Sequence, residues 1–294
     1  MSGDFAIGAR DFTAAPLAPG LYLVATPIGN LKDITLRALE TLAAADLVLC
    51  EDTRHTARLF AAYGIRTPRS PLHEHNERER IEGVLNAIGA GKAVALVSDA
   101  GTPLLSDPGF PLVRAARGRD IPVYAVPGAS ALLAGLTVSG LPTDSFSFHG
   151  FLPPRTGART NALMALAGRP ETLIFYESPR RLAGTLADMA EVFGPDRNAA
   201  VALELTKKFE RVAQGRLSEM AARFAAEPQK GEAVVLVAGA AAGEAASAED
   251  WQAALAQALE TEPLRAAVDA VAARYGLRRK EVYDVALALK AATR

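Results

Sequence analysis

Short apolar runs alternate with segments of helical spacing along the first 126 residues of the chain. A continuous apolar run indicates a buried strand, whereas apolar residues that recur every three to four positions indicate a helix. Strands are predicted at 21–25, 46–50, 93–97 and 122–126. Helices are predicted between them: one begins near residue 36, a second ends near residue 62, and two more span 77–90 and 109–118. This alternation is typical of a mostly parallel sheet with helices on both faces.

The second half of the chain predicts another α/β unit. Strands are expected at 146–149, 172–176, 199–203, 209–213 and 233–237, with helices from about residue 160 and over 180–192. A chain of 294 residues is long enough for two domains. We therefore expect five segments: a flexible tail (1–19), an N-terminal α/β domain (20–128), a C-terminal α/β domain (129–240), a linker (241–249) and a helical extension (250–294).

The composition excludes several classes of protein. The single cysteine, Cys50, rules out an internal disulfide and a cysteine-rich zinc site. The net charge of −1 gives no overall attraction to nucleic acid, so such a partner would need a local basic patch. The sequence has neither a G-x-G-x-x-G motif after the first strand nor a P-loop, which argues against nicotinamide cofactors and nucleoside triphosphates. Without a signal-peptide pattern or an apolar run of membrane-spanning length, the chain is expected to be cytoplasmic, with no membrane partner.

Polar loops follow the four predicted strands of the first half, at 26–32, 51–55, 98–108 and 127–130. Ligands of α/β sheets lie beyond the carboxyl ends of the strands, where these loops would converge. The loop 98–108 is long and rich in glycine, proline and short oxygen-bearing side chains, so it is either a ligand cradle or an ordinary turn-rich connection. Asp99 or Thr102 could hold a ribose hydroxyl or an ammonium group.

Two polar stretches in the same half each allow more than one interpretation. The run from Glu51 to His55 is either a helix start capped by Asp52 with a solvated Arg54, or an acid or base beside a phosphate-binding arginine. The run from His73 to Glu77 allows a metal site, a loop in which Asn76 caps the next helix, or an active-site rim. Because the H-E-x-x-H spacing is missing, we expect no metal.

Basic residues form local clusters that could contact phosphates, although basic clusters are often merely solvated. They occur at Arg155 and Arg159, at Arg180-Arg181, at Lys207-Lys208, and at Arg278, Arg279 and Lys280. The last cluster lies in a segment, 263–294, with seven basic and three acidic residues. Two predicted helices, 264–275 and 278–290, flank Gly276-Leu277 with helix-turn-helix spacing, which indicates either nucleic-acid contact or simple helix packing.

Several motifs, taken together and in order, resemble one known family. They are Thr26-Pro27-Ile28-Gly29-Asn30-Leu31, Glu51-Asp52-Thr53-Arg54-His55, Ser98-Asp99-Ala100-Gly101-Thr102-Pro103, Ser106-Asp107-Pro108-Gly109, Pro127-Gly128-Ala129-Ser130, Gly150-Phe151-Leu152-Pro153, Phe175-Tyr176-Glu177-Ser178, Glu204-Leu205-Thr206-Lys207 and Lys230-Gly231-Glu232. The set is similar to the ribosomal RNA small subunit methyltransferase I group of the tetrapyrrole methylase superfamily. The likeness runs from about residue 21 to 238, and the helical tail resembles that group's helix-turn-helix extension.

The resemblance implies two α/β domains of tetrapyrrole methylase type with a cofactor cleft between them, plus a small C-terminal helix-turn-helix-like extension. It implies an enzyme, usually a homodimer, that uses S-adenosylmethionine to methylate the ribose 2′-hydroxyl of a cytidine in the decoding region of 16S RNA in the small ribosomal subunit. By position, the cofactor contacts would be Ile28, Asp99, Ala100, Gly101, Thr102, Leu104, Ser130, Ala131, Tyr176, Thr206 and Glu232.

Roles for the remaining candidates stay open at this point. A ribose hydroxyl is a weak acid, so a base would assist its methylation, and the candidates are Asp52, His55 and His75. The RNA-binding candidates are Arg54, Arg155, Arg159, Lys207, Lys208, Arg278, Arg279 and Lys280. The alternatives to this function are a methyltransferase acting on a tetrapyrrole ring, and a non-catalytic ribosome-assembly factor that retains the cofactor cleft.

Overall fold

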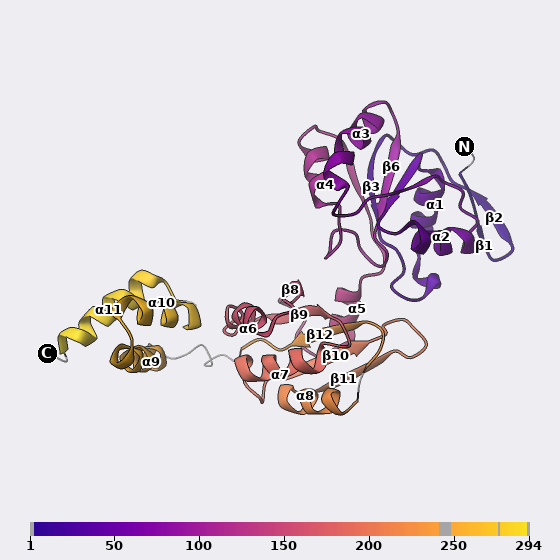
Figure 1. Ribbon diagram of the computed structural model, residues 1–294. Coiled ribbons are helices and arrows are strands. Elements are labelled where there is room, and N and C mark those ends of the chain that lie inside the picture. The colour runs from indigo at the N-terminus through magenta and orange to yellow at the C-terminus, as the bar shows by residue number, and fades with distance from the viewer. Residues whose placement is uncertain (1–2, 228, 241–247, 276, 293–294) are drawn as a thin grey trace. The chain divides into compact units, whose positions relative to one another are not determined.

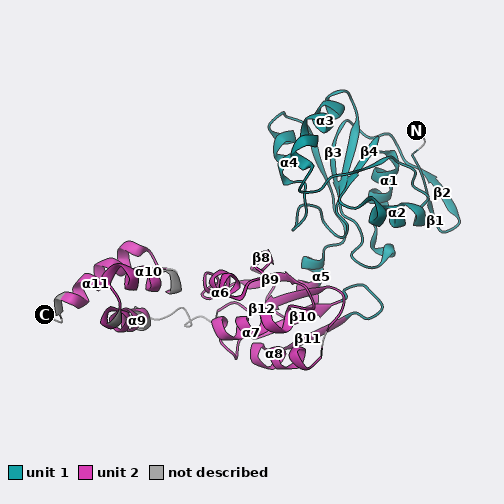
Figure 2. Cartoon of the chain, in the orientation of Figure 1, with its two compact units in different colours: residues 1–134, 204–210 teal, residues 135–203, 211–294 magenta. Residues whose placement is uncertain are grey.

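The computed structural model describes residues 3–227, 229–240, 248–275 and 277–292 (Figure 1). The chain divides into two compact units (Figure 2). Unit 1 comprises Met1–Ala134 and Glu204–Glu210, and unit 2 comprises Gly135–Leu203 and Arg211–Arg294. The predicted division at residue 128 lies six residues before this one, and the prediction did not separate the segment 204–210 from its neighbours.

Unit 1 is built on a five-stranded sheet in the order β5-β4-β6-β3-β7. Every neighbouring pair in this sheet is parallel. The strands are β3 (Gly20–Val24), β4 (Leu47–Cys50), β5 (Arg69–Pro71), β6 (Ala93–Val97) and β7 (Val123–Val126). The four predicted strands are confirmed within one residue at each end, whereas β5 was not predicted because Arg-Ser-Pro carries no apolar signal.

Helices cover both faces of this sheet, as its central strand shows. All five residues of β6 are buried, which follows from coverage on both sides. Ala95 and Val97 pack in one core with α1 (Leu36–Ala44) and α2 (Thr53–Ala62), while Val94 and Leu96 pack in another with α3 (Glu77–Gly89) and α4 (Phe110–Arg117). The predicted parallel sheet with helices on both faces is therefore confirmed for unit 1.

Polar side chains begin three of these helices, although not all as predicted. The hydroxyl of Thr35 accepts a hydrogen bond from Ala38 N at the start of α1, and Asp52 accepts one from Arg54 N at the start of α2. Asn76 precedes α3 but makes no capping hydrogen bond, so that prediction is wrong. Its side chain accepts instead from His73 N and closes the preceding loop.

The prediction of a flexible tail over residues 1–19 is wrong for its first part. Strands β1 (Asp4–Ile7) and β2 (Arg10–Thr13) pair as an antiparallel hairpin, and Gly8 supplies the positive φ of 62° that its tight turn needs. Phe5 is buried in the core that contains residues of α1 and α2, and Ala6 N donates to Tyr63 O just after α2. Burial of the Phe5 side chain holds the hairpin in place. The small residues around it along the chain gave no indication of this contact.

Unit 2 contains a mixed five-stranded sheet in the order β11-β10-β12-β9-β8. β8 and β9 are parallel, and the other neighbouring pairs are antiparallel. The strands are β8 (Phe146–Phe151), β9 (Thr172–Glu177), β10 (Asn198–Leu203), β11 (Arg211–Arg216) and β12 (Ala233–Val237). The helices of this region are α5 (Ala131–Val138), α6 (Thr156–Met164), α7 (Leu182–Phe193) and α8 (Leu217–Ala226).

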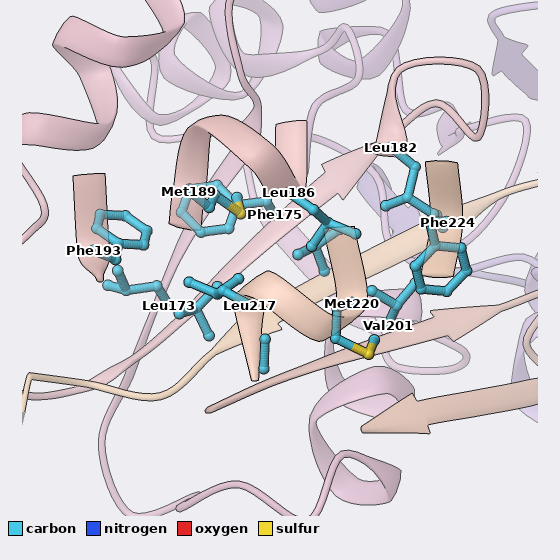
Figure 3. Close-up of a cluster of buried hydrophobic side chains, with 14 of the residues drawn as sticks. Leu173, Phe175, Leu182, Leu186, Met189, Phe193, Val201, Leu217, Met220 and Phe224 are labelled. Carbon is cyan, nitrogen blue, oxygen red and sulfur yellow. The ribbon is translucent and has the colours of Figure 1, made fainter. Parts of the chain in front are cut away.

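Helices α7 and α8 supply much of the core beside this sheet (Figure 3). Leu186 and Met189 of α7 lie with Phe175 of β9, and Met220 and Phe224 of α8 belong to the same cluster. The sequence reasoning did not identify α8, although Leu217, Met220 and Phe224 recur at helical spacing.

Three helices form the C-terminal extension: α9 (Ala248–Thr261), α10 (Leu264–Tyr275) and α11 (Arg279–Ala292). They share a small core that contains Trp251, Leu255, Val268 and Val282. The predicted helices 264–275 and 278–290 are confirmed, and the third helix adds to them. Residues 241–247 of the predicted linker lie outside the described residues, and its last two residues begin α9. Within the described ranges, no helix combines the length and apolar character needed to cross a membrane.

Candidate cofactor site and nucleic-acid interface

Hydrogen bonds from backbone and side-chain groups join three strand-end loops of unit 1. Thr26 N donates to Gly101 O at 2.9 Å, and Gly101 N donates back to Thr26 O at 3.0 Å. Thr102 Oγ1 donates to Ala129 O at 3.2 Å, which joins the loop after β6 to the loop after β7. Most of the predicted cofactor residues of unit 1 therefore lie in one connected group of loops: Ile28, Asp99, Ala100, Gly101, Thr102, Leu104, Ser130 and Ala131.

Close backbone packing in these loops requires glycine. Gly101 has a φ of +83°, and a Cβ there would lie 3.2 Å from Ile28 Cγ2. A Cβ on Gly128 would lie 3.1 Å from Ala25 Cβ. These glycines let the loops after β3, β6 and β7 approach each other more closely than larger residues would allow.

Strained backbone occurs at two of the predicted cofactor residues. Among the described residues, five non-glycine residues have positive φ, and they include Leu104 at 74° and Thr206 at 63°. Such conformations are uncommon and persist only where the surrounding structure imposes them, as it does at many ligand sites.

The segment 204–210 packs on the loop after β3 within unit 1. Gly29 has space for no side chain because Lys207 Cγ lies against it, and Leu205 O is 3.2 Å from the same position. Lys207 Nζ pairs with Glu204 Oε1 at 2.9 Å, and Thr206 N donates to Glu210 Oε2 at 2.6 Å. Thr206 is thereby placed beside the loops that contain Ile28 and Gly101.

Thr206 also has a hydroxyl that the protein does not use. Its Oγ1 is buried and has no hydrogen-bond partner within the part of the chain that the structure describes. A buried hydroxyl is normally hydrogen-bonded, because leaving it unpaired costs about 1–3 kcal/mol. A polar group of a ligand would satisfy it.

Acidic residues and one histidine meet beyond the ends of β4 and β6. Asp99 Oδ1 accepts from Asp52 N at 3.0 Å, and Asp99 Oδ2 lies 3.5 Å from His55 Nδ1. Burial and the nearby Glu51 raise the pKa of Asp107 to about 6, with Asp99 adding to the effect and a hydrogen bond from Ser98 opposing it. Burial, followed by the charge of Asp99, raises the pKa of Glu51. Sequence reasoning assigned Asp107 no role, although its position in the loop before α4 placed it at this edge.

The three predicted bases differ in their surroundings. Hydrogen bonds from the Arg54 side chain and backbone lower the pKa of Asp52 to about 2, so its carboxylate is a weak base held in an ion pair of 2.7 Å. His75 is exposed, and its ring meets His73 edge-on at 5.9 Å between centroids. His55 is placed in the first turn of α2, beside Asp99.

Two predicted cofactor residues lie in unit 2, at one edge of its sheet. Tyr176 is near the carboxyl end of β9 and pairs with Val234, and Glu232 directly precedes β12. Phe148 and Phe151 of β8 meet the Tyr176 ring edge-on, with centroids 4.7 and 5.7 Å away. Tyr176 and Glu232 therefore lie toward the same end of the paired strands β9 and β12.

The prediction that Arg159 contacts RNA is wrong. Its side chain is only 8% exposed, and Nε forms an ion pair with Asp188 Oδ2 at 2.5 Å. The guanidinium also donates to Pro154 O and Thr156 Oγ1, so it holds the start of α6 to α7. Arg155, one turn earlier, is exposed.

The other basic candidates are at least partly exposed. Arg54 is 89% exposed although paired with Asp52, and Lys208 lies over the ring of the exposed Phe209. Arg278, Arg279 and Lys280 gather at the start of α11, where Arg279 pairs with Asp269 of α10. The extension therefore presents a compact cationic cluster.

The motifs and this fold agree with comparisons to known proteins. The sequence profile of the tetrapyrrole (corrin/porphyrin) methylases matches residues 20–221, and that of the RsmI C-terminal HTH domain matches residues 244–290. Ribosomal RNA small subunit methyltransferase I of Mesorhizobium japonicum is 55% identical over 79% of each chain. The protein of the same name from Pseudomonas aeruginosa is 48% identical over 91% of this chain and 96% of its own.

Solved structures support the fold independently. Diphthine synthase superposes with a TM-score of 0.59 at 18% identity, covering 74% of this chain and 89% of its own. Uroporphyrin-III C-methyltransferase from Thermus thermophilus, in complex with S-adenosylhomocysteine, superposes with a TM-score of 0.52 at 23% identity, covering 74% and 96%. The chain therefore belongs to the tetrapyrrole methylase family and, within it, to the ribosomal RNA small subunit methyltransferase I group.

Proposed function

We propose that this chain uses S-adenosylmethionine to methylate the 2′-hydroxyl of a cytidine ribose in the decoding region of 16S ribosomal RNA, within the small ribosomal subunit. The observation that carries the proposal is similarity of 48% identity to a ribosomal RNA small subunit methyltransferase I over 91% of this chain. Residues 244–290 match the RsmI C-terminal HTH domain, which adds support because this match covers a part of the chain that the tetrapyrrole methylase match does not.

The residues of unit 1 fit a cofactor of this kind. The hydroxyl of Thr206 is buried without a partner among the described residues, and Gly101 packs closely against Ile28. We propose that these loops and two residues of unit 2 hold S-adenosylmethionine. The proposed contacts are Ile28, Asp99, Ala100, Gly101, Thr102, Leu104, Ser130, Ala131, Tyr176, Thr206 and Glu232.

Methyl transfer requires mainly that the cofactor and the ribose hydroxyl are correctly positioned. When bound, S-adenosylmethionine supplies a methyl group that its sulfonium already activates. The loops of unit 1 orient the cofactor and remove water from it, which favours in-line transfer. A ribose hydroxyl loses its proton reluctantly, so a nearby base assists the reaction.

The proposed RNA contacts are basic side chains that remain accessible. Arg54, Lys207 and Lys208 of unit 1 and Arg155 of unit 2 would contact phosphates of the RNA. Arg278, Arg279 and Lys280 would add contacts from the extension. A ribosomal substrate implies a cytoplasmic enzyme. We further propose a homodimer, which is the assembly that the resemblance to this family implies.

A transfer assay tests the function. Purified protein is incubated with S-adenosylmethionine labelled in its methyl group and with small subunits from cells that lack the modification. We expect label in 2′-O-methylcytidine after digestion of the RNA to nucleosides. Absence of label overturns the proposal, and turnover on a porphyrinoid added in a parallel reaction would assign the chain to tetrapyrrole chemistry instead.

A further inference from the structure

His55 and Asp99 face each other although 43 residues separate them in the sequence. They follow neighbouring strands, since Cys50 of β4 pairs with Val97 of β6 at the carboxyl edge of the sheet. His55 Nδ1 lies 3.5 Å from Asp99 Oδ2. The parallel register therefore brings an imidazole and a carboxylate together at the edge where the cofactor loops lie.

Asp99 is held in place from its other side. Its Oδ1 accepts from the backbone N–H of Asp52, the residue that starts α2, so Oδ2 is left toward His55. A carboxylate beside one ring nitrogen places the hydrogen of a neutral histidine on that nitrogen and leaves the other as an acceptor. His55 Nδ1 would thus carry the hydrogen, and Nε2 would carry the lone pair.

The exposure of the two side chains suits a large substrate. The His55 side chain is 58% exposed, whereas that of Asp99 is 32% exposed. An RNA ribose can reach the imidazole, and the carboxylate behind it is better shielded. This arrangement is the one that orients a general base and stabilises its protonated form.

We propose that His55 accepts the proton of the ribose 2′-hydroxyl and that Asp99 is the positioning residue that directs His55 Nε2 toward it. The inference rests on the proposed function. The ribose oxygen forms its bond to the methyl carbon as the bond from that carbon to sulfur breaks, and the electron pair of the broken bond stays on sulfur. The hydroxyl proton passes to His55 Nε2, and the resulting imidazolium is paired with Asp99.

The other acidic groups at this end of the sheet are weaker candidates for accepting the proton of the ribose hydroxyl. Asp52 is tied to Arg54 in an ion pair, and its carboxylate is a weak base. Burial raises the pKa of Asp107 and of Glu51, and electrostatic contact with the Asp99 carboxylate adds to the effect in each of them. Asp107 is the strongest competitor because its raised pKa would allow it to take up a proton.

The tautomer of His55 tests the pair without cofactor or RNA. Nitrogen NMR of protein labelled with ¹⁵N-histidine distinguishes the two neutral tautomers, and His55→Gln identifies the signals of residue 55 among the four histidines. We expect the hydrogen on Nδ1 in the wild type. In Asp99→Asn, the Asp52 N–H selects the amide oxygen, so the amide NH₂ faces His55 and reverses the tautomer.

Kinetics test the catalytic role. We expect Asp99→Asn and His55→Gln each to lower kcat by about 10²–10⁴-fold. His55→Gln should leave KM for S-adenosylmethionine unchanged, because His55 is not among the proposed cofactor contacts. Added imidazole should restore part of the activity of His55→Gly. Asp120→Asn is the matched control, because this exposed aspartate precedes β7 at the opposite edge of the same sheet.

Distinct results overturn the inference. A wild-type tautomer with the hydrogen on Nε2, or no change in Asp99→Asn, removes the positioning role. Full activity in His55→Gln removes the acceptor role, and loss of activity in Asp107→Asn alone would transfer it to Asp107. If the wild type itself transfers no methyl group, the proposed function fails and the acceptor role fails with it, while the NMR result still reports on the pair.

Discussion

Replacing Thr206 with valine should stabilise the ligand-free protein and weaken its cofactor binding. The substitution exchanges a hydroxyl for a methyl group of similar size and keeps the branched Cβ, so the strain of the positive φ of 63° is the same in both proteins. What changes is the buried Oγ1, which lacks a hydrogen-bond partner among the described residues.

The expected magnitudes follow from that one atom. Removing a buried, unpaired hydroxyl should raise the free energy of unfolding of the ligand-free protein by about 1 kcal/mol, the lower end of its burial cost. In the complex, the polar group of S-adenosylmethionine that Thr206 would contact loses its partner, which costs about 1–3 kcal/mol. That loss corresponds to an increase in Kd of about 5- to 150-fold.

Titration calorimetry with S-adenosylmethionine and thermal denaturation without it measure the two effects separately. Thr206→Ser is the matched control, because it keeps the hydroxyl and should bind the cofactor with an affinity close to that of the wild type. An unchanged Kd in Thr206→Val would refute the contact between this hydroxyl and the cofactor. A lower melting temperature in the ligand-free variant would show that the hydroxyl already has a partner.

Four further predictions follow from the structure. Deleting residues 250–294 should weaken RNA binding and reduce the slope of log K against log salt by about 2 for its three clustered cations, with cofactor affinity unchanged in calorimetry. Gly101→Ala should lower stability by about 1–2 kcal/mol, measured by urea denaturation, because its φ is +83°. Asp188→Ala should cost about 3–5 kcal/mol in the same assay, since it leaves the buried Arg159 unpaired, and adding Arg159→Met should recover much of the loss. The pKa of Asp107 rises on folding from 3.8 to about 6, so its neutral form favours the folded state below pH 3.8 and this contribution is lost as the pH rises through 6. Asp107→Asn should remove that part of the pH dependence of the melting temperature, and an unchanged profile would contradict the shift.

Strands β6 and β12 could be predicted because they are short, apolar and fully buried. Ala93–Val97 is continuous in its apolar character because helices cover both faces, and β12 over Ala233–Val237 has the same pattern. Helix starts were predictable where a short polar side chain caps the first turn, as Asp52 does at the start of α2.

Features that depend on a distant partner could not be predicted in this way. Arginine is usually a surface residue, so the sequence alone favours an exposed Arg159. Its burial depends on the ion pair with Asp188, which lies 29 residues away in the sequence. Phe5 has a partner in a hairpin that lies in a segment of small and polar residues. A one-dimensional pattern carries no information on either contact.

The candidate site shows the same limit. The motifs placed the proposed cofactor loops at strand ends, where the hydrogen bonds between Thr26 and Gly101 join two of them. The sequence did not choose among Asp52, His55 and His75 as the base, because it does not show that His55 lies beside Asp99 or that Asp52 is held by Arg54. The parallel register of β4 and β6 supplies that information.

The most direct test of the proposed function is a map of ribose methylation on small-subunit RNA from cells with and without this protein. We expect one cytidine of the decoding region to carry a 2′-O-methyl group in the first case and to lose it in the second, with recovery on return of the wild-type chain. A methylation map that is identical with and without the protein would contradict the proposal.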